Sequence, residues 1–375
     1  MRLVYFTHSL RSCWNHGNAH FLRGVLGEFA SRGHDVAAYE PRGAWSLDNL
    51  LRDHGEEGLD AYRQAYPGLN STTYGDDIDL DQAIGGADVV IVHEWNDPWL
   101  VAAIGAHRAH GGTYQLFFHD THHRAVSDPV AMQAYALDGY DAVLAFGETL
   151  AEVYRGWGWG ERVRVWHEAA DTRVFRPPSP SPEPGDTSAK GLVWIGNWGD
   201  DERSQELEAY LFQPSQRLGL PLDTHGVRYP ESARATLARY GASYRGWAPN
   251  AAAPAIFARH LATAHIPRRF YVDALPGIPT IRVFEALACG IPLVSAPWHD
   301  TEGLFRVGTD FLMAEDPAEM EQHLAAVRDD LDLRASLAAH GLATIRARHT
   351  CAHRVDELLA FTARLGAGRT LETSA

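Results

Sequence analysis

Short apolar runs alternate with segments of helical periodicity in the first third of the chain. Residues 3–7 are mostly apolar and are followed by polar residues, which predicts a strand, and residues 21–32 carry apolar side chains at helical spacing before Gly33. The predicted strands are 3–7, 34–39, 88–93 and 113–119, with a long polar region at 42–81. Strands that alternate with helices in this way predict a parallel sheet in an α/β fold.

A proline-rich stretch, residues 177–188, separates this part from a second one with the same alternation. Its sequence, PPSPSPEPGDTS, is typical of an extended connector. Beyond it we predict strands at 191–196, 222–227 and 291–295 and helices at 202–211, 254–260 and 281–288. The chain therefore divides into an N-terminal Rossmann-like domain, a linker, a C-terminal Rossmann-like domain, and a final helix with a tail, at 1–176, 177–189, 190–348 and 349–375.

Length and composition fit two domains. The chain has 375 residues, of which 45% are hydrophobic, and this is enough for two ordinary cores. The formal net charge is −15 and no basic block occurs, so we expect no nucleic-acid partner. Three widely spaced cysteines, Cys13, Cys289 and Cys351, indicate no disulfide framework and favour the reducing cytoplasm. We expect no signal sequence or membrane span, whereas peripheral membrane contact stays open.

Polar residues follow several predicted strands at the point where each strand ends. They are Thr7-His8, His93-Glu94-Trp95 and His119-Asp120. The carboxyl ends of parallel strands line the ligand cleft in such folds, so we predict that these residues form one cleft wall. A nearby polar loop contains His16 and Asn18, which together with Glu94 are our candidates for contact with an acceptor, although the loop could instead contact a phosphate. Each of these side chains could instead be a structural polar group.

The most informative segment, ALPGIPTIRVFEALACGIPLVS at 274–295, joins a Gly/Pro loop to a helix start. The free amides of Thr280 and Ile281 and the positive end of the helix dipole suit a diphosphate, to which Arg282 adds charge. Glu285, farther along the helix, could accept hydrogen bonds from two ribose hydroxyls. Alternatively, the loop merely starts a helix and Glu285 is a solvated helix residue.

The loop 196–199 is a second candidate phosphate site and contains Asn197 and Trp198 between two glycines. Glycines allow close backbone approach, and Arg203 near the next helix could neutralise charge on a leaving diphosphate. Arg268, with its neighbour Arg269, could lie near the same pyrophosphate. A simple turn at the loop and a solvated basic turn at 268–269 are the alternatives.

The 274–295 segment resembles the donor-binding helix of GT-B glycosyltransferases, especially the CgeB-like group near glycosyltransferase families 1 and 4. The pattern that carries this resemblance is Pro-Thr-x-Arg-x-Phe-Glu-Ala-x-Ala-x-Gly. Weaker similarities to the same family occur earlier in the chain, in the order in which the family has them. They lie at 16–20, 32–36, 87–93, 171–177 and 244–250. The resemblance implies the GT-B fold: two Rossmann-like α/β domains whose parallel sheets face an interdomain cleft. It places the acceptor in the first domain and the nucleotide sugar in the second, with the last helix crossing back.

The resemblance also implies roles for single residues. His119 would bind the donor sugar from across the cleft, and the segments at His225 and at Gly246 and Trp247 would lie beside the nucleotide base. Trp247 could equally pack in a core. For the cluster that begins at His119, three other roles compete with sugar binding: Asp120 as a general base, a metal site, or a purely structural role.

Gly277 departs from the family pattern, because related retaining enzymes have a glutamate at this position that normally contacts the donor sugar. The sugar and the stereochemical outcome therefore stay open. Residues 76–79, Asp-Asp-Ile-Asp, lack the sheet context of a metal-binding acidic motif, so we expect no metal. Serine-hydrolase and P-loop motifs do not occur in the chain.

These observations together predict a metal-independent glycosyltransferase without a cofactor. It would move a sugar, most plausibly a hexose, from a UDP-sugar to a hydroxyl acceptor in polysaccharide or glycoconjugate synthesis. A sugar-nucleotide epimerase or hydrolase of the same fold is one alternative, and a non-catalytic scaffold that binds sugar nucleotides is another. We expect Glu285→Ala to weaken nucleotide binding and leave the fold intact, because a helix-surface carboxylate adds little to stability.

Overall fold

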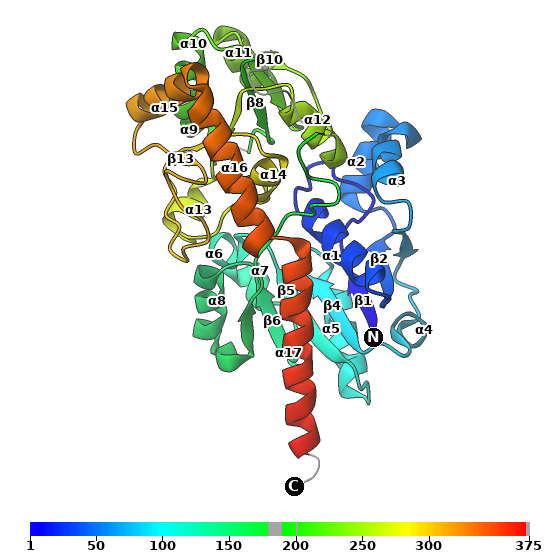
Figure 1. Cartoon of the computed structure of the whole chain (residues 1–375). Coiled ribbons are helices and arrows are strands. Elements are labelled where there is room, and N and C mark those ends of the chain that lie inside the picture. Colours follow the sequence, from blue (N-terminus) through cyan, green and yellow to red (C-terminus); the bar gives the residue numbers. More distant parts are fainter. Residues whose placement is uncertain (179–189, 200–201, 373–375) are drawn as a thin grey trace.

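The structure is a computed structural model that describes residues 1–178, 190–199 and 202–372. Two α/β units lie one above the other, and long C-terminal helices run past both (Figure 1). Nearly all of the predicted linker, from residue 179 to 189, falls outside the described residues.

The N-terminal unit contains a seven-stranded parallel sheet of order β3-β2-β1-β4-β5-β6-β7. Its strands are β1 (Arg2–Phe6), β2 (Asp35–Pro41), β3 (Ser71–Tyr74), β4 (Val89–His93), β5 (Gln115–Asp120), β6 (Ala142–Ala145) and β7 (Val163–Val165). Its helices are α1 (Ala19–Ser31), α2 (Trp45–His54), α3 (Asp60–Ala65), α4 (Leu80–Ile84), α5 (Pro98–Ala109), α6 (Arg124–Ser127), α7 (Pro129–Gln133) and α8 (Glu148–Tyr154). The polar region 42–81 forms α2, α3, β3 and α4, which we did not predict because these short elements bury few apolar side chains.

The C-terminal unit contains a six-stranded sheet of order β10-β9-β8-β11-β12-β13, also paired in parallel. Its strands are β8 (Leu192–Ile195), β9 (Leu222–His225), β10 (Ser243–Tyr244), β11 (Ala262–His265), β12 (Leu293–Ser295) and β13 (Leu312–Met313). Its helices are α9 (Ser204–Leu207), α10 (Gln213–Arg217), α11 (Glu231–Arg239), α12 (Ala253–Phe257), α13 (Arg269–Asp273), α14 (Ile281–Cys289), α15 (Pro317–Asp329) and α16 (Leu331–Arg348). Two parallel α/β sheets confirm the predicted fold class.

The helix predicted at 202–211 is irregular: α9 continues through a π-helical turn at Glu208–Phe212 into α10. By contrast, α14 matches its predicted range closely. Thr280 precedes it in an extended conformation, and Gly290 ends it with a φ of +68°, a left-handed conformation that glycine adopts without strain.

The hydrophobic cores of the two units are not separate. One cluster contains Leu3 and Phe21 of the first unit together with Val283 and Phe284 of α14. On the other face of the first sheet, Tyr271, Leu275 and Ile278 of the second unit join a cluster built mainly from the first. The α13–α14 region is therefore packed against the N-terminal unit on both sides of its sheet.

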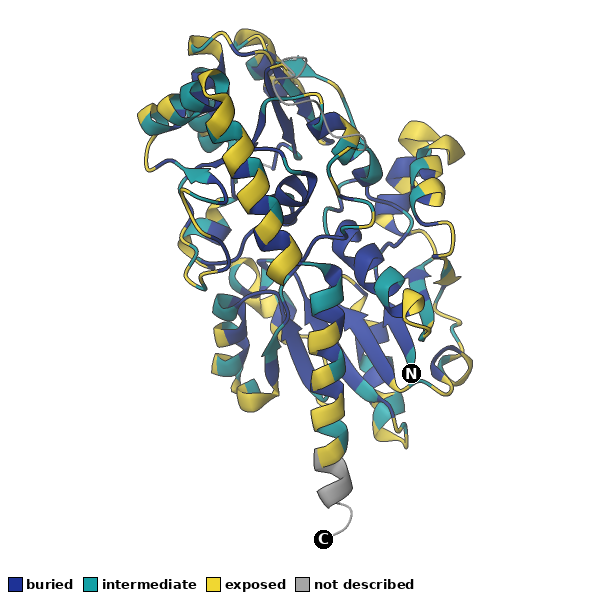
Figure 2. Ribbon diagram, in the orientation of Figure 1, coloured by how far each residue is buried: buried dark blue, intermediate teal, exposed yellow. Residues whose placement is uncertain are grey.

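The last helix, α17 (Cys351–Glu372), leaves the C-terminal unit and packs on α1. The crossing is held by two backbone hydrogen bonds: Ala170 N–H donates to His349 O at 2.9 Å, and Cys351 N–H donates to Ala170 O at 2.9 Å. Val355 and Leu358 are buried in the core shared by both units, while other positions of α16 and α17 face solvent (Figure 2). The chain thus crosses between the units near residues 349–351.

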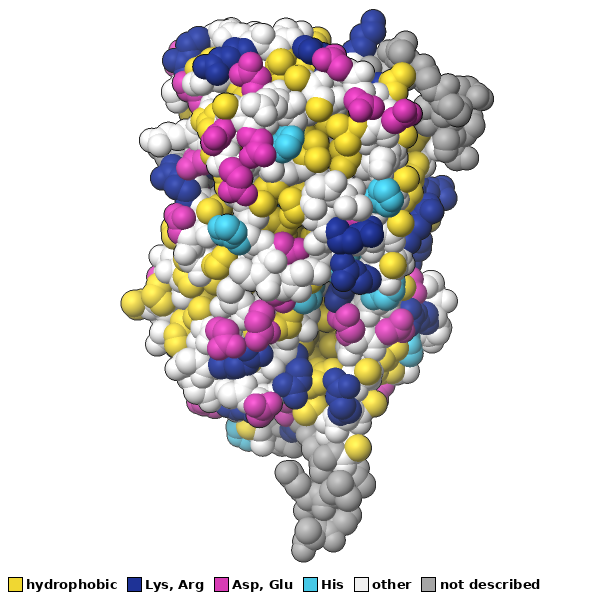
Figure 3. Space-filling view, turned by 60° about the vertical axis from the view of Figure 1, so that its left-hand side comes forward, with side chains coloured by type: hydrophobic (Ala, Val, Ile, Leu, Met, Phe, Trp, Pro, Cys, Tyr) yellow, Lys and Arg dark blue, Asp and Glu magenta, His cyan; other side chains and the backbone are white. Residues whose placement is uncertain are grey.

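Acidic and basic side chains lie interspersed over the face drawn in Figure 3. In the part of the chain that the structure describes, no helix is both long enough and apolar enough to span a bilayer.

The α1–α17 contact gives a stability prediction. A Cβ at Gly24 would lie 2.4 Å from Cys351 Sγ and 2.7 Å from Asp171 Cβ, so we expect Gly24→Ala to lower the free energy of unfolding by about 1–3 kcal/mol. Urea unfolding measures this change. Gly366→Ala is the matched control, because its Cβ would meet Gln115 at an ordinary 3.7 Å in a helix and should not destabilise. Equal stability of Gly24→Ala and the wild-type protein would contradict the packing described here.

Candidate functional site

The predicted edge of the first sheet contains a cluster of histidines. His93 and His119 are register partners on β4 and β5, and their ring centroids lie 5.5 Å apart. The ring of His8, after β1, lies 6.0 Å from that of His93 and 4.0 Å from that of His16. The loop before α1 and the ends of three strands therefore meet at one place.

These imidazoles are uncharged at neutral pH. Burial lowers the pKa of His8 to about 4 and that of His119 to about 3, and it holds the pKa values of His16 and His93 well below the usual range. A neutral imidazole can donate one hydrogen bond and accept another. His119 Nδ1 lies 2.5 Å from the Tyr5 hydroxyl, whereas its Nε2 is buried and has no partner among the described residues.

Asp120 has both carboxylate oxygens engaged. Its Oδ1 accepts a hydrogen bond from His122 N–H at 3.0 Å, and its Oδ2 accepts one from the Tyr154 hydroxyl at 2.7 Å. The side chain is fully buried, and this burial raises its pKa to about 6. In this structure Asp120 holds the turn after β5 and presents no free oxygen, which does not favour the general-base role.

Glu94 is the neighbouring buried acid. Its Oε2 lies 3.2 Å from Arg124 Nη1, and its Oε1 is buried without a partner among the described residues. Burial, and then the charge of Asp120, raise the pKa of Glu94 well above its usual range. Glu94 is therefore fully buried at the strand ends, with one oxygen that has no partner among the described residues.

Glu285 is placed differently from our expectation. Its side chain is fully buried, its Oε1 accepts a hydrogen bond from His20 Nδ1 at 2.9 Å, and its Oε2 pairs with Arg282. His20 Nε2 in turn accepts the Asp171 N–H at 2.7 Å, which leaves the ring proton on Nδ1. Glu285 is therefore neither solvated nor at the helix surface, because α1 of the other unit covers this turn of α14. Its role toward a ribose stays a prediction.

Three arginines gather beside the start of α14. Arg203 donates to Asn197 O at 2.5 Å and to Ile266 O at 3.2 Å. Burial and the charge of Arg268, with a smaller effect of Arg282, lower the pKa of Arg203 to about 9. Burial is the largest cause of this lowered pKa. Arg268 is paired with Glu202 at 3.0 Å and Arg282 with Glu285, so each of these two guanidinium groups already has a carboxylate partner.

The 196–199 loop lies at the junction of the units. Asn197 Oδ1 accepts the Val227 N–H at 3.0 Å, and the Asn197 side chain also bonds that of Asn15 in the first unit. Trp198 instead packs in the core of the second unit, with its ring parallel to that of Phe212 at 6.1 Å. The prediction that Trp198 lines a donor site is therefore not supported by its position.

The predicted base-side residues lie near one another. The carbonyl of Gly246 accepts a hydrogen bond from the N–H of Gly226 at 2.9 Å, which joins the segment after β10 to the one that contains His225. His225 Nδ1 and Trp247 Nε1 are buried without partners among the described residues. The Trp247 ring lies 4.7 Å from that of His54, so it bridges to α2 of the first unit.

Asn18 and Glu168 form a further pair at the junction. Asn18 Nδ2 donates to Glu168 Oε1 at 2.6 Å, and burial raises the pKa of Glu168 to about 8, with a smaller contribution from Glu285. Thr280 and Ile281 begin α14 close by, since a Cβ at Gly17 would lie 3.0 Å from Ile281 Cγ2. The segment that contains Asn18 therefore lies close to the start of α14.

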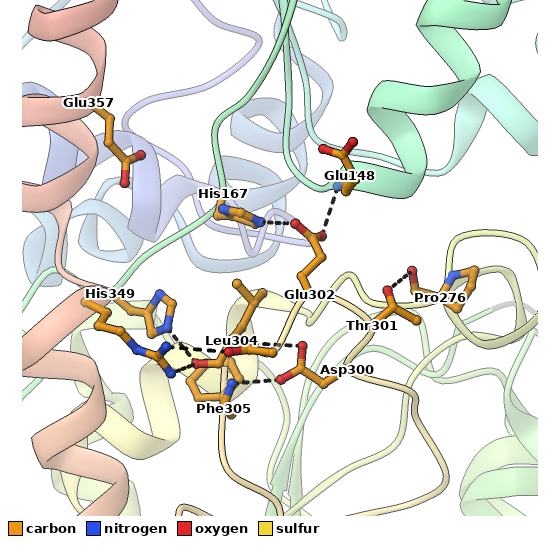
Figure 4. Close-up of polar contacts among 12 residues, drawn as sticks. Glu148, His167, Pro276, Asp300, Thr301, Glu302, Leu304, Phe305, His349 and Glu357 are labelled. Carbon is orange, nitrogen blue, oxygen red and sulfur yellow. Dashed lines mark hydrogen bonds and ion pairs between the residues drawn. The ribbon is translucent and has the colours of Figure 1, made fainter.

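The position of Gly277 is closed by a neighbouring loop: a Cβ there would lie 2.1 Å from Thr301 Oγ1. Glu302, which follows Thr301 in this loop, points into the N-terminal unit (Figure 4). Its Oε2 lies 2.7 Å from His167 Nε2, and its Oε1 accepts the Glu148 N–H at 2.9 Å. Sequence patterns carried no signal for this contact, because Glu302 lies 135 residues from His167.

Among the residues that the structure describes, no group of three or more His, Cys, Asp or Glu side chains could hold a metal ion. The predicted metal independence stays a prediction, as do the individual ligand roles.

Comparisons with known proteins agree with this architecture. Residues 203–360 match the family model described as Glycosyl transferase-like, whereas no curated protein matches the chain. Sucrose-phosphate synthase from Thermosynechococcus elongatus has a similar structure at 12% identity and a TM-score of 0.66, over 98% of this chain and 99% of that one.

Two further solved structures are similar over 97% of this chain. HepE from Anabaena in complex with UDP gives 13% identity and a TM-score of 0.67 over all of that chain. An alpha-glucosyltransferase in complex with UDP and a 13-mer DNA gives 11% identity and a TM-score of 0.67 over 99% of that chain. At these identities the likeness shows the fold.

The buried contact of Glu285 revises the expectation for its removal. Glu285→Ala leaves Arg282 and the His20 N–H without their acceptor, so we expect the free energy of unfolding to fall by about 3 kcal/mol or more. Urea unfolding tests this, with Glu321→Ala as a control that removes only an exposed contact to Arg217. A loss no larger than that of the control would contradict the buried link.

The neutral state of His119 gives a pH prediction. The unfolded state takes up a proton near pH 6.5 and the folded state only near pH 3, so this histidine makes the protein less stable as pH falls through that window. We expect the stability of His119→Asn to fall less steeply between about pH 6.5 and 4, by up to about 1.4 kcal/mol per pH unit. His340→Asn, at an exposed position, is the control. Parallel pH curves for His119→Asn and the wild-type protein would show that His119 is not buried in its neutral form.

Proposed function

We propose that this chain, which has the GT-B fold and carries a glycosyl transferase-like domain at 203–360, transfers a sugar from a nucleoside diphosphate to a hydroxyl acceptor. The observation that carries this proposal is the group of Arg203, Arg268 and Arg282 beside the partly buried start of α14. A diphosphate would offer these guanidinium groups a further anion, and the amides at Thr280 and Ile281 would add hydrogen bonds.

The ion pair between Arg282 and Glu285 in α14 would rearrange when a nucleotide binds. The diphosphate offers Arg282 a second anion, so its approach would release Glu285 Oε2 to accept ribose hydroxyls. His20 keeps Glu285 Oε1 and thereby holds the carboxylate in place. His225, Gly246 and Trp247 then lie on the base side, and Arg203 holds Asn197 in the loop beside the phosphates.

The transfer itself would depend on positioning and on stabilising the leaving group. The oxygen of the acceptor hydroxyl attacks the anomeric carbon while the bond from that carbon to the diphosphate oxygen breaks, and the hydroxyl proton passes to the departing diphosphate. The arginines stabilise the charge on the released diphosphate. The free Nε2 of His119 suits a hydroxyl of the donor sugar. We take the sugar to be a hexose and the nucleotide to be UDP. The arginines, rather than a metal ion, would neutralise the charge of the diphosphate.

UDP is favoured because HepE, which shares the fold, is described in complex with UDP. The three free cysteines are buried, which agrees with action in the reducing cytoplasm. We propose that the enzyme acts in the synthesis of a polysaccharide or a glycoconjugate.

A thermal-shift titration tests the donor site. We expect UDP to raise the melting temperature with and without magnesium, and Arg268→Gln to weaken UDP binding about tenfold to a hundredfold through loss of a charged hydrogen bond. Arg269→Gln is the matched control, because its guanidinium pairs with Glu206 while Arg268 pairs with Glu202 near Arg203.

The outcomes distinguish the proposals. No shift with UDP, GDP, ADP, CMP or dTDP would contradict the donor site. If UDP binds, product analysis with a UDP-sugar separates transfer from epimerisation or hydrolysis, and binding without turnover of any UDP-sugar would instead indicate a scaffold.

A further inference from the structure

The first unit exposes aromatic rings at the edge that faces the junction. Among the described residues, the large hydrophobic side chains that are exposed include three tryptophans, Trp45, Trp95 and Trp99. Trp45 begins α2, Trp95 follows β4, and Trp99 lies in the first turn of α5, so all three follow the carboxyl ends of strands. Tryptophan is enriched at binding interfaces, where its ring gives an apolar surface and its N–H a hydrogen-bond donor.

Trp95 differs from the other two in what surrounds it. The side chain is 43% exposed, the Arg124 guanidinium carbon lies 4.7 Å from the ring centroid, and the His122 ring lies 5.1 Å from it. The His8 ring is 6.2 Å away. Arg124 is held in turn by Glu94 at 3.2 Å, so one side of the indole is supported by fixed groups.

The groups around Trp95 have unused hydrogen-bonding capacity. His8 Nδ1, His122 Nδ1 and Glu94 Oε1 are buried, and none of them has a partner among the described residues. Burial lowers the pKa of His8 to about 4 and holds the pKa of His122 well below its usual range, so both rings are neutral. Buried polar atoms without partners are costly, and a ligand that supplies hydroxyl groups would satisfy them.

We propose that Trp95 is the platform of the acceptor site and that the acceptor is a saccharide whose pyranose ring stacks on the indole. A pyranose has an apolar face of C–H groups and a rim of hydroxyls, and each hydroxyl both donates and accepts hydrogen bonds. The flat indole would stack on the apolar face of the sugar. The polar atoms of His8, His122 and Glu94 that have no partner would form hydrogen bonds with its hydroxyl groups. This inference rests on the proposed transferase function and names its acceptor class.

Other occupants match the site less well. A nucleic acid would meet a chain of formal charge −15 and the buried acid Glu94 beside the platform. A lipid chain would leave the polar atoms of His8 and His122 unsatisfied.

The platform is connected to the donor side through adjacent rings. The His122 ring lies 4.0 Å from that of His123, which stacks on Phe270 of the second unit at 4.5 Å. Phe270 follows Arg268 by two residues, and the charge of Arg268 contributes to the lowered pKa of His122. The surroundings of Trp95 are therefore linked, through His122, His123 and Phe270, to the segment that contains Arg268.

A glycan array of neutral gluco-, galacto- and manno-oligosaccharides, probed with the full-length protein in saturating UDP, tests the inference. We expect the wild-type protein to bind at least one saccharide, Trp95→Ala to bind it at least about tenfold more weakly, and Trp95→Phe to keep part of the affinity. Trp45→Ala is the matched control, because Trp45 is more exposed, at 54%, and packs on Trp14 away from the histidines. Its binding should equal that of the wild-type protein.

The UDP thermal shift of the same proteins separates the two proposals. If the wild-type protein gives no shift, the transferase proposal fails by itself. If UDP shifts every variant but the wild-type protein binds no saccharide, or Trp95→Ala binds as well as Trp45→Ala does, the saccharide inference is overturned while the donor site stands. Preferential binding of an oligonucleotide or of phospholipid vesicles at Trp95 would also overturn it.

Discussion

The buried contact between Glu285 and His20 is the constraint on which the site depends. It joins α14 to α1 across 265 positions of sequence, in surroundings where neither side chain reaches water. A carboxylate in such surroundings needs partners, and His20 and Arg282 provide them. His20 is itself oriented by the Asp171 N–H, so the backbone of the first unit determines where the carboxylate of the second unit lies.

Other contacts across the junction reinforce this arrangement. Glu302 is presented by a loop whose shape depends on Asp300, which accepts the Leu304 and Phe305 amides at 3.0 and 2.7 Å (Figure 4). Tyr271 and its neighbours extend the hydrophobic core of the first sheet. The two units therefore share polar and apolar contacts, and the residues proposed to bind donor and acceptor are positioned together.

The two sides of the junction have different electrostatic character. Burial keeps the histidines of the first unit neutral, which suits hydroxyl groups that need both donors and acceptors. The second unit concentrates guanidinium groups, and burial together with the charge of Arg268 lowers the pKa of Arg203 to about 9. A neutral polar wall opposite a cationic one matches a reaction between a hydroxyl compound and a diphosphate ester.

Local patterns in the sequence were sufficient for the elements that carry the site. The alternation of strands and helices predicted two parallel sheets, the Pro-Thr start and Gly290 predicted α14, and the polar strand ends predicted the histidine edge. These features depend on periodicity, on backbone preferences and on the rule that parallel strands end at one edge, all of which are local or topological.

Tertiary structure decided which of these polar groups are available to a ligand. Glu285, Trp198 and Asp120 each occur in a motif that suggests ligand binding, yet each has its partners inside the protein. Conversely, the exposure of Trp95 and the unpaired atoms of His8, His122 and Glu94 became visible only in the folded chain. The reason is physical: whether a side chain is free depends on burial and on partners that lie far away in sequence, and neither is recorded in the spacing of residues along the chain.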